Sequence, residues 1–268
     1  MDAVNARAAA RPASTAFAWS GKQKLALVAL LAYTVYVIAQ IDLSPARLLS
    51  GLHQGARFLS RMFPPDLAKM DVLWEGIRET LQIAVLATVG GVALSLPVGL
   101  MAARNMVPRW VCAIARGLIA VCRAVHPVIT AIMFVKAVGF GPLAGILALT
   151  VATVGFVGKL FADAIEEISH KQIEAVRATG ASFGNVVLFG VLPQVMSRFV
   201  GFATYQLDSN LRNSTMVGIV GAGGIGGALF SAFLRFEYSF VCTILATVIA
   251  IIVVGELVVN ATRKALDV

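Results

Sequence analysis

The apolar residues of this chain fall into long blocks, not into the alternating or one-faced patterns of soluble strands and helices. A helix needs roughly 20 apolar residues to cross the hydrocarbon of a bilayer, and the runs 80–103 and 213–234 contain no charged residue. We therefore predict an all-α integral membrane protein with about six transmembrane helices. Their predicted ranges are 25–41, 80–101, 110–138, 143–165, 195–211 and 240–260.

Composition and charge agree with a bilayer-embedded chain. Hydrophobic residues make up 59% of the 268 residues and charged residues 13%, against roughly 45–50% and about 25% in soluble domains. The net charge is +8, but the basic residues concentrate at the ends of the predicted spans. We interpret this charge as topology bias and contact with lipid headgroups, not as nucleic-acid binding.

The positions of lysine and arginine predict the topology. Six spans place both termini on one side of the membrane, and the positive-inside rule makes that side the cytoplasm. The basic residues that support this are Lys22, Lys24, Arg104, Arg109, Lys171, Arg177, Arg263 and Lys264. The opposite turn, 139–142, carries no charge, whereas the segment 42–79 carries five basic residues and is the exception.

This topology divides the chain into four parts. Residues 1–24 are predicted to form a cytoplasmic tail and residues 25–41 the first transmembrane helix. Residues 42–79 form an extracytoplasmic amphipathic segment with a short interfacial helix. Residues 80–264 form the membrane core, and its cytoplasmic loop is 166–194.

The cytoplasmic loop contains a helix–glycine–helix pattern. Residues 174–179 favour a helix, and Gly180 is placed to end it in a left-handed conformation that a side chain would disfavour. Ser182 can cap a second helix, which Pro193 separates from the next span. A compact element of this kind can transmit force, although a well-capped connecting loop explains the same pattern.

Charged residues inside membrane spans are costly and often mark transport routes. Arg109, Arg116 and Arg123 are seven residues apart and share one helix face, with His126 on the same side. The other charged candidates are Lys159, Arg198, Asp208 and Arg212. A basic stripe suits a route for anions, but structural pairing or contact with lipid phosphate also explains it. The last two candidates are four residues apart, so an intrahelical ion pair is the simpler interpretation.

The glycine-rich run Gly221-Ala-Gly223-Gly224-Ile-Gly226 satisfies the G-x-G-x-x-G spacing. No βαβ unit surrounds it, which excludes a dinucleotide site. Glycines at this density let helices pack closely, or let a chain break inside the membrane where it lines a cavity. The three histidines lack metal-ligand spacing and no P-loop sequence is present. We therefore predict no catalytic residue, no metal site and no cofactor on this chain.

The cytoplasmic loop resembles the EAA loop of ABC-importer permeases. The shared positions are Glu174, Ala175, Gly180, Leu192 and Pro193, while Val176 and Gly190 replace the usual Ala and Ile. Four stretches resemble the phosphonate-importer permease family in particular. They are GFGPLAG (139–145), GFVGKLFADAIEEI (155–168), EAVRATGAS (174–182) and LRNSTMVGIVGAGGIG (211–226). Asp163 and Asp208 stand where that resemblance leads us to expect Glu.

The resemblance implies a type I ABC-importer permease in the bacterial cytoplasmic membrane that moves a phosphonate or related phosphorus oxyanion inward. It implies a homodimer with two ABC ATPase subunits, which bind ATP and Mg, and an extracytoplasmic substrate-binding protein. The loop would dock on the ATPase, and residues 214–218 would lie at the gate. The implied candidates for the gate and the translocation pathway are Arg123, His126, Lys159, Asp208, Arg212, Met216, Gly221, Gly223 and Gly224.

Three alternatives remain open. A permease for methionine or another small solute would share the coupling loop. An ion-coupled secondary transporter would use Asp208 and Glu256 as coupling acids and would need no ATPase. A membrane enzyme acting on lipid phosphates would need acids or histidines gathered at one depth, and the sequence shows no such set.

Overall fold

The structure, a computed structural model, describes residues 20–40 and 44–265, and it is helical with no strand in these ranges. The chain divides into two units, Met1–Leu59 and Ser60–Val268. The first unit contains α1 (Gly21–Gln40) and most of α2 (Pro45–Met62). Most of the predicted tail, residues 1–19, lies outside the described residues.

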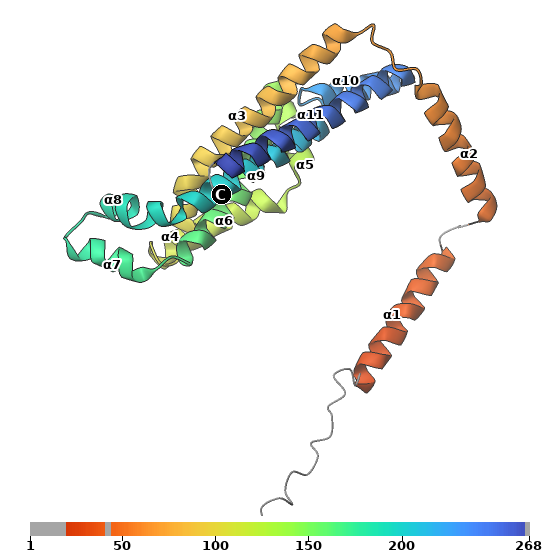
Figure 1. Ribbon diagram of the computed structural model, residues 1–268. Coiled ribbons are helices and arrows are strands. Elements are labelled where there is room, and N and C mark those ends of the chain that lie inside the picture. The colour runs from red at the N-terminus through yellow and green to blue at the C-terminus, as the bar shows by residue number, and fades with distance from the viewer. Residues whose placement is uncertain (1–19, 41–43, 266–268) are drawn as a thin grey trace, which may run out of the picture. The chain divides into compact units, whose positions relative to one another are not determined.

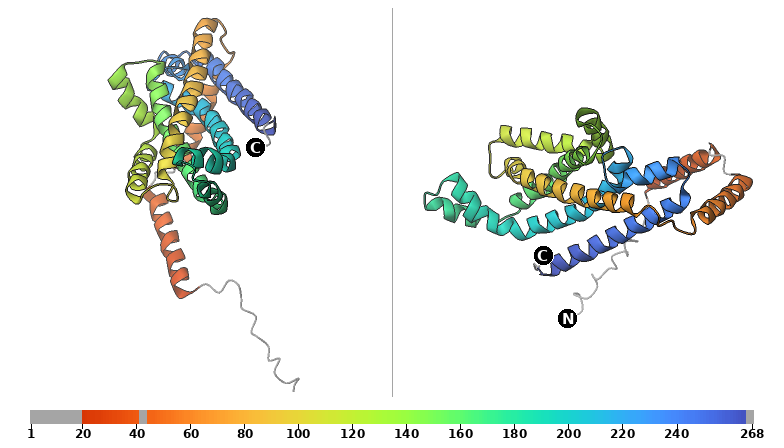
Figure 2. Two further views of the ribbon diagram at one scale, coloured as in Figure 1. Left: turned by 90° about the vertical axis from the view of Figure 1, so that its left-hand side faces the viewer. Right: turned by 90° about the horizontal axis from the view of Figure 1, so that it is seen from above.

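The second unit is a helical bundle organised around α6 (Figures 1 and 2). Its elements are α3 (Met70–Ala102), α4 (Arg109–Ala124), α5 (Pro127–Val138), α6 (Pro142–Glu166), α7 (His170–Ala178), α8 (Phe183–Asn185), the π-helical η1 (Val186–Val191), α9 (Leu192–Ile219), α10 (Ile225–Leu234) and α11 (Tyr238–Ala265). Helix α6 packs against α3, α4, α5 and α9, and α11 packs against α9 and α10. The short helices α7 and α8 lie at one end of the bundle and α10 lies near the other (Figure 1).

Five helices in the described ranges are long and apolar enough to cross a membrane, and a sixth span is formed if α4 and α5 count as one broken span. The prediction of about six spans is confirmed at this level. The boundaries differ: α3 begins at Met70, so the end of the predicted segment 42–79 belongs to a membrane helix. The reason is packing, because Leu73 and Gly76 are already buried and continue the core face of α3.

The predicted span 110–138 is not one helix, because α4 and α5 meet at an angle of 93°. Pro127 disfavours helical geometry in the residue before it, and His126 accordingly has an extended backbone (ψ 140°). The side chain of His126 caps α5, with Nδ1 accepting from the N–H of Val128 at 3.3 Å. The break corrects the prediction that His126 continues the face of α4 that carries Arg123.

Small side chains allow α3 and α6 to approach closely. The residues that α3 buries, apart from Leu73 and Ile83, are Gly76, Thr80, Ala84, Ala87, Thr88, Gly91, Ser95, Gly99 and Ala102. Within a bilayer, where lipid tails are as apolar as leucine, such close backbone packing drives helix association. The hydroxyls of Thr80, Thr88 and Ser95 donate to backbone carbonyls one turn earlier, which satisfies them inside the helix.

Candidate functional site

The segment 170–191, called the coupling segment below, folds back on itself as α7, α8 and η1. Gly180 ends the first helix with φ +75°, the left-handed backbone expected of it. Its N–H donates to the carbonyl of Arg177 at 3.0 Å. Ser182 occupies the N-cap position of α8, but its side chain makes no capping hydrogen bond. The glycine therefore makes the turn, while the expected serine cap is absent.

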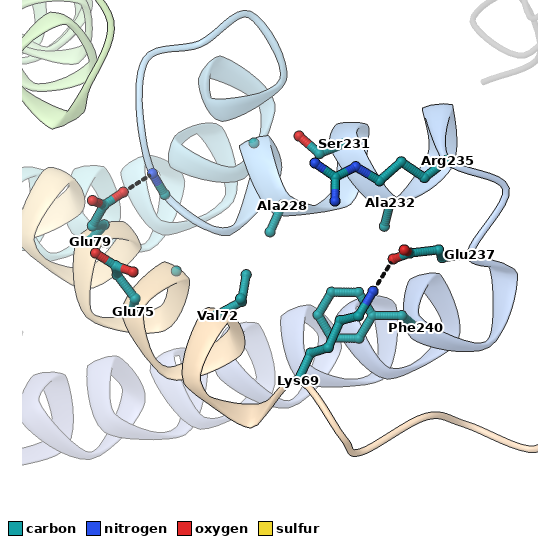
Figure 3. Close-up of a pocket in the computed structure, with 13 residues that line it drawn as sticks. Lys69, Val72, Glu75, Glu79, Ala228, Ser231, Ala232, Arg235, Glu237 and Phe240 are labelled. Carbon is teal, nitrogen blue, oxygen red and sulfur yellow. Dashed lines mark hydrogen bonds and ion pairs between the residues drawn. The ribbon is translucent and has the colours of Figure 1, made fainter.

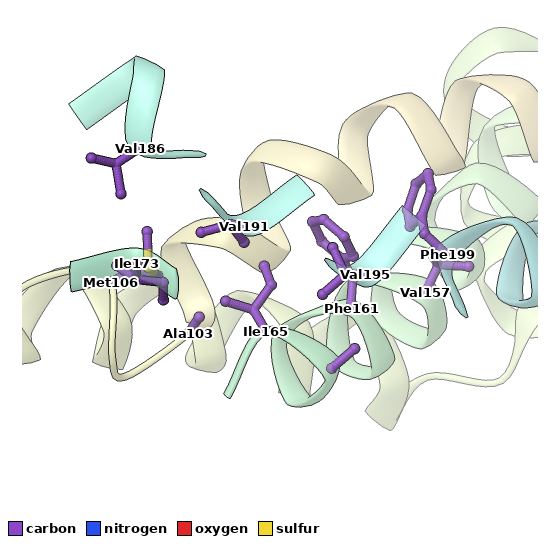
Figure 4. Packing of buried hydrophobic residues seen from close by; sticks show 11 residues of the cluster. Ala103, Met106, Val157, Phe161, Ile165, Ile173, Val186, Val191, Val195 and Phe199 are labelled. Carbon is purple, nitrogen blue, oxygen red and sulfur yellow. The ribbon is translucent and has the colours of Figure 1, made fainter. Parts of the chain in front are cut away.

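A buried apolar cluster joins the coupling segment to the membrane helices (Figure 4). The coupling segment contributes Ile173, Val186 and Val191, each at most 3% exposed. The cluster continues through Ala103, Met106, Val157, Phe161, Ala164, Ile165, Val195 and Phe199. A Cβ on Gly190 would lie 3.7 Å from the Cα of Ile173, so the small residue there lets α7 pack on η1. This close packing fixes the inner face of the coupling segment against the helices that it contacts.

The outer face of the coupling segment is exposed. Glu174 and Ala175 lie on this face of α7, away from the cluster. Three large apolar side chains, Phe183, Leu188 and Phe189, are 51%, 51% and 66% exposed. An exposed apolar patch beside charged residues is typical of a protein-binding surface.

The coupling segment continues into α9 without a break, which corrects the prediction that Pro193 separates the two. Leu192 and Pro193 are the first two residues of α9, and Pro193 supplies no N–H to the helical turn before it. The helix widens to the π-helical η1 just before this point. The side chain of Gln194 donates to the carbonyl of Gly190 at 2.5 Å, which satisfies one backbone acceptor of that turn. A single helical path of 37 residues, Phe183–Ile219, therefore leads from the coupling segment into the bundle.

That path ends at a glycine-rich loop, residues 220–224, between α9 and α10. Gly221, Gly223 and Gly224 have φ of +87°, +79° and +82°, a region that side chains disfavour. A Cβ on Gly223 would also lie 2.7 Å from the backbone nitrogen of Pro142. Met216 lies on α9 just before this loop and is 52% exposed. The loop geometry thus needs glycine at three positions.

Two residues of α3 hold the start of α10. The carboxylate Oε2 of Glu79 accepts from the N–H of Gly224 at 2.7 Å, and Oγ1 of Thr80 accepts from the N–H of Ile225 at 2.8 Å. The first N–H groups of a helix have no partner within the helix, so α3 caps α10 from another element. Sequence reasoning missed both residues because the capping is not local.

A cavity of about 670 Å³ lies beside this capped helix end (Figure 3). Glu75 and Glu79 line one side, and Arg235 reaches in from the opposite side. Lys69 and Glu237 form an ion pair that joins the start of α3 to the connection before α11. In the sequence, the signal for this cavity is the pair Glu75 and Glu79, four residues apart just before the predicted span 80–101.

A buried polar cluster joins α3, α6 and α9. Asn210 is fully buried, and its Nδ2 donates to the hydroxyls of Thr88 at 2.9 Å and Thr153 at 3.0 Å. Gln206 donates to Thr153 at 3.2 Å and to Oδ1 of Asn210 at 3.0 Å. Hydrogen bonds between helices in this setting fix their register. The sequence showed these residues as isolated polar positions, not as a cluster.

Several of the predicted charged residues have a polar partner in the structure. Arg116 donates to the carbonyl of Ala102 at 2.9 Å and to Glu166 at 2.6 Å, so it ties three elements together. Asp208 pairs with Arg212 on α9, with Nη1 and Oδ1 3.2 Å apart, and Lys159 pairs with Asp163 on α6. The remaining charged candidates are Arg109, Arg123 and Arg198, of which Arg198 pairs with Glu167 at 2.7 Å. The structure brings Arg116, Arg123 and Lys159 together at one cavity, which His126 does not line.

Comparisons with known proteins bear on this arrangement. The family described as binding-protein-dependent transport system inner membrane component matches residues 95–267. A putative phosphite transport system permease protein, HtxC of Stutzerimonas stutzeri, is 38% identical over 227 residues, which cover 84% of this chain and 79% of the relative. The phosphate-import permease protein PhnE of Mycolicibacterium smegmatis is 40% identical over 217 residues, 79% of this chain but only 40% of that longer relative.

A solved structure has the same fold. The inward-facing MetNI methionine ABC transporter contains a chain that aligns with a TM-score of 0.65 at 25% identity. The alignment covers 75% of this chain and 99% of that chain.

Proposed function

Because the chain belongs to the family of binding-protein-dependent transport system inner membrane components, we propose that it is the membrane permease of an ATP-driven importer for phosphonate or a related phosphorus oxyanion. Relatives named for phosphite and phosphate import are 38% and 40% identical, whereas the methionine transporter chain is 25% identical. This difference favours a phosphorus oxyanion over methionine as cargo.

The observation that carries the proposal is the exposed coupling segment packed onto the bundle through Ile173, Val186 and Val191. A partner that pulls on α7 moves η1 with it, and η1 is continuous with α9. Helix α9 ends at the loop 220–224, which α3 holds through Glu79 and Thr80. Force applied at one end of this helical bundle thus reaches a glycine-rich loop at its other end.

We assign the predicted residues on this basis. Glu174, Ala175, Gly180, Leu192 and Pro193 couple the chain to an ATPase subunit. Met216 and the loop glycines Gly221, Gly223 and Gly224 form the gate. The polar and charged candidates of the pathway are Arg123, His126, Lys159, Asp208 and Arg212, of which Asp208 and Arg212 form a pair on α9. ATP and Mg bind to the ATPase subunits, and this chain contributes no catalytic group.

The working assembly contains two permease chains, two ATPase subunits and an extracytoplasmic substrate-binding protein. We propose a second copy of this chain as the other permease. Both termini face the cytoplasm, on the side of the coupling segment. ATP binding draws the two coupling segments together and opens the permease outward, and hydrolysis returns it to the inward-open state.

Substrate-stimulated ATP hydrolysis by the reconstituted complex tests this function. The complex, with its binding protein, is assayed with methylphosphonate, phosphite, phosphate and methionine at equal concentrations. We expect at least one phosphorus oxyanion to stimulate hydrolysis several-fold and methionine to leave it at the basal rate. If methionine alone stimulates ATP hydrolysis, the proposed phosphorus oxyanion cargo is refuted. Uptake into liposomes that contain this chain without any ATPase subunit would refute the ATP-driven mechanism.

A further inference from the structure

A second cavity, of about 370 Å³, lies between α4 and α6 and is lined by three cations. Arg116 and Arg123 come from α4 and Lys159 comes from α6, and the other lining residues are Ile119, Ala120 and Ala124. No carboxylate among residues 20–40 and 44–265 lines this cavity. A water occupies about 30 Å³ in the liquid, so the cavity has room for a tetrahedral oxyanion and several waters.

The packing of α4 on α6 holds these cations in place. A Cβ on Gly155 of α6 would lie 2.9 Å from Cγ of Arg123, so the glycine lets the stem of this arginine lie directly against α6. Glu166 and the carbonyl of Ala102 hold Arg116 through two hydrogen bonds of 2.6 and 2.9 Å. Lys159 is held by Asp163 one turn along the same helix. The small side chains of Ala120 and Ala124 leave the space between the charged groups open.

The charges around the cavity do not balance. Glu166 and Asp163 neutralise Arg116 and Lys159, but they engage these side chains from outside the cavity lining. Arg123 forms no ion pair with any residue in the described part of the chain, so one positive charge is left over. A guanidinium without a negative partner inside a predicted membrane span raises the free energy of the folded protein in the bilayer. A bound anion lowers that free energy because it neutralises the charge. The planar guanidinium binds two oxygens of a phosphate-type group at once, which favours that class of anion.

We propose that this cavity is a binding site for a phosphate-class oxyanion, with Arg123 as its principal ligand and Arg116 and Lys159 as supporting cations. The inference deepens the proposed function, which places Arg123 and Lys159 in the pathway, and its evidence is the charges and packing of α4 and α6. The same chemistry is offered by the headgroup of an anionic phospholipid and by a free phosphorus oxyanion.

Two measurements on the purified full-length chain test the site and distinguish these sources. The first titrates inorganic phosphate into the chain in phosphatidylcholine nanodiscs and follows binding by calorimetry. The second counts the phosphatidylglycerol molecules that the chain retains in mild detergent, by native mass spectrometry. Each uses the wild type, Arg123→Gln, Arg123→Lys and the control Arg109→Gln, which removes an arginine from the same helix outside the cavity.

We expect Arg123→Gln to weaken phosphate binding, or lower phosphatidylglycerol retention, by about tenfold or more, since a charge-assisted bidentate contact is lost. Arg123→Lys keeps the charge but loses the two-oxygen contact, so its binding should lie between that of the wild type and that of Arg123→Gln. Arg109→Gln should match the wild type. Loss of phosphate binding identifies a free anion, and loss of lipid retention identifies a headgroup. The site is refuted if Arg123→Gln matches Arg109→Gln in both measurements while both variants elute as folded protein.

This experiment separates the site from the proposed function. Stimulation of ATP hydrolysis by methylphosphonate together with unchanged binding in Arg123→Gln would overturn the site alone. Binding that depends on Arg123 in a complex that no phosphorus oxyanion stimulates would overturn the proposed cargo alone.

Discussion

Gly226 shows how single residues set the distance between helices in this protein. It lies at the start of α10, where α10 crosses the end of α9, and a Cβ there would lie 1.9 Å from the carbonyl oxygen of Thr215. Gly218 faces it from α9, and a Cβ at Gly218 would lie 2.9 Å from the Cα of Gly226. The two backbones are therefore in direct contact, and no side chain fits between them.

The change Gly226→Ala should destabilise the folded protein by about 3 kcal/mol or more, because rigid backbone must move to admit a methyl group. Gly117→Ala is the matched control, since Gly117 lies in α4 with no atom within 4 Å of an added Cβ. Alanine there should stabilise the helix by roughly 0.5–1 kcal/mol. Thermal unfolding followed by gel filtration measures the melting temperature of both variants. Equal melting temperatures for the two variants would contradict the close packing of α9 and α10.

At the scale of elements, the coupling segment combines a rigid inner face with an exposed outer face. Its turn depends on the left-handed backbone of Gly180, and its inner face depends on the buried residues Ile173 and Val186. The sequence predicted two separate helices on either side of Pro193, but η1 is continuous with α9, and this continuity determines how motion passes along the chain. A bend at Pro193 would have absorbed motion, whereas a continuous helix passes it on.

We expect Gly180→Val to lower substrate uptake at least tenfold and to uncouple ATP hydrolysis from substrate, with the permease still inserted. A β-branched residue disfavours the left-handed conformation by about 1–3 kcal/mol, which changes the angle between α7 and α8. Gly184→Val is the control, because Gly184 lies in the same segment, has no positive φ and has open space around it. Uptake by proteoliposomes of the full complex measures the effect. Normal uptake by Gly180→Val would show that this turn has no role in coupling ATP hydrolysis to transport.

At the scale of the whole molecule, α9 is the element that connects the two functional ends, and the buried polar cluster holds it. Gln206 and Asn210 of α9 meet Thr88 of α3 and Thr153 of α6. The apolar surfaces around them would permit α9 to slide, but hydrogen bonds with fixed partners permit one register. The cluster thus keeps the coupling segment and the glycine-rich loop 220–224 at a fixed separation.

The change Gln206→Leu should destabilise the bundle by roughly 1–2 kcal/mol, because Oδ1 of Asn210 loses its donor in a buried position. Gln82→Leu is the control, since Gln82 is exposed on α3 and should have little effect on stability. Unfolding by denaturant in detergent compares the two. A Gln206→Leu variant as stable as Gln82→Leu would show that the cluster contributes nothing to the register of α9.

The sequence by itself determined the features that depend on local physics. Runs of apolar residues predicted the spans because the transfer of each residue into lipid depends on its own side chain. Gly180 was predicted to be left-handed because backbone sterics act within one residue. The break at His126 was also readable from Pro127, a local signal that the sequence interpretation passed over.

Only the tertiary structure decided which distant residues meet. Glu79 accepts from the N–H of Gly224, 145 residues later, and Asn210 bonds a threonine 122 residues away. Arg123 of α4 and Lys159 of α6 meet at one cavity because Gly155 lets α4 pack directly against α6, and neither helix alone predicts that contact. Such contacts depend on how small residues let helices approach, and that geometry is a property of pairs of helices rather than of either sequence segment.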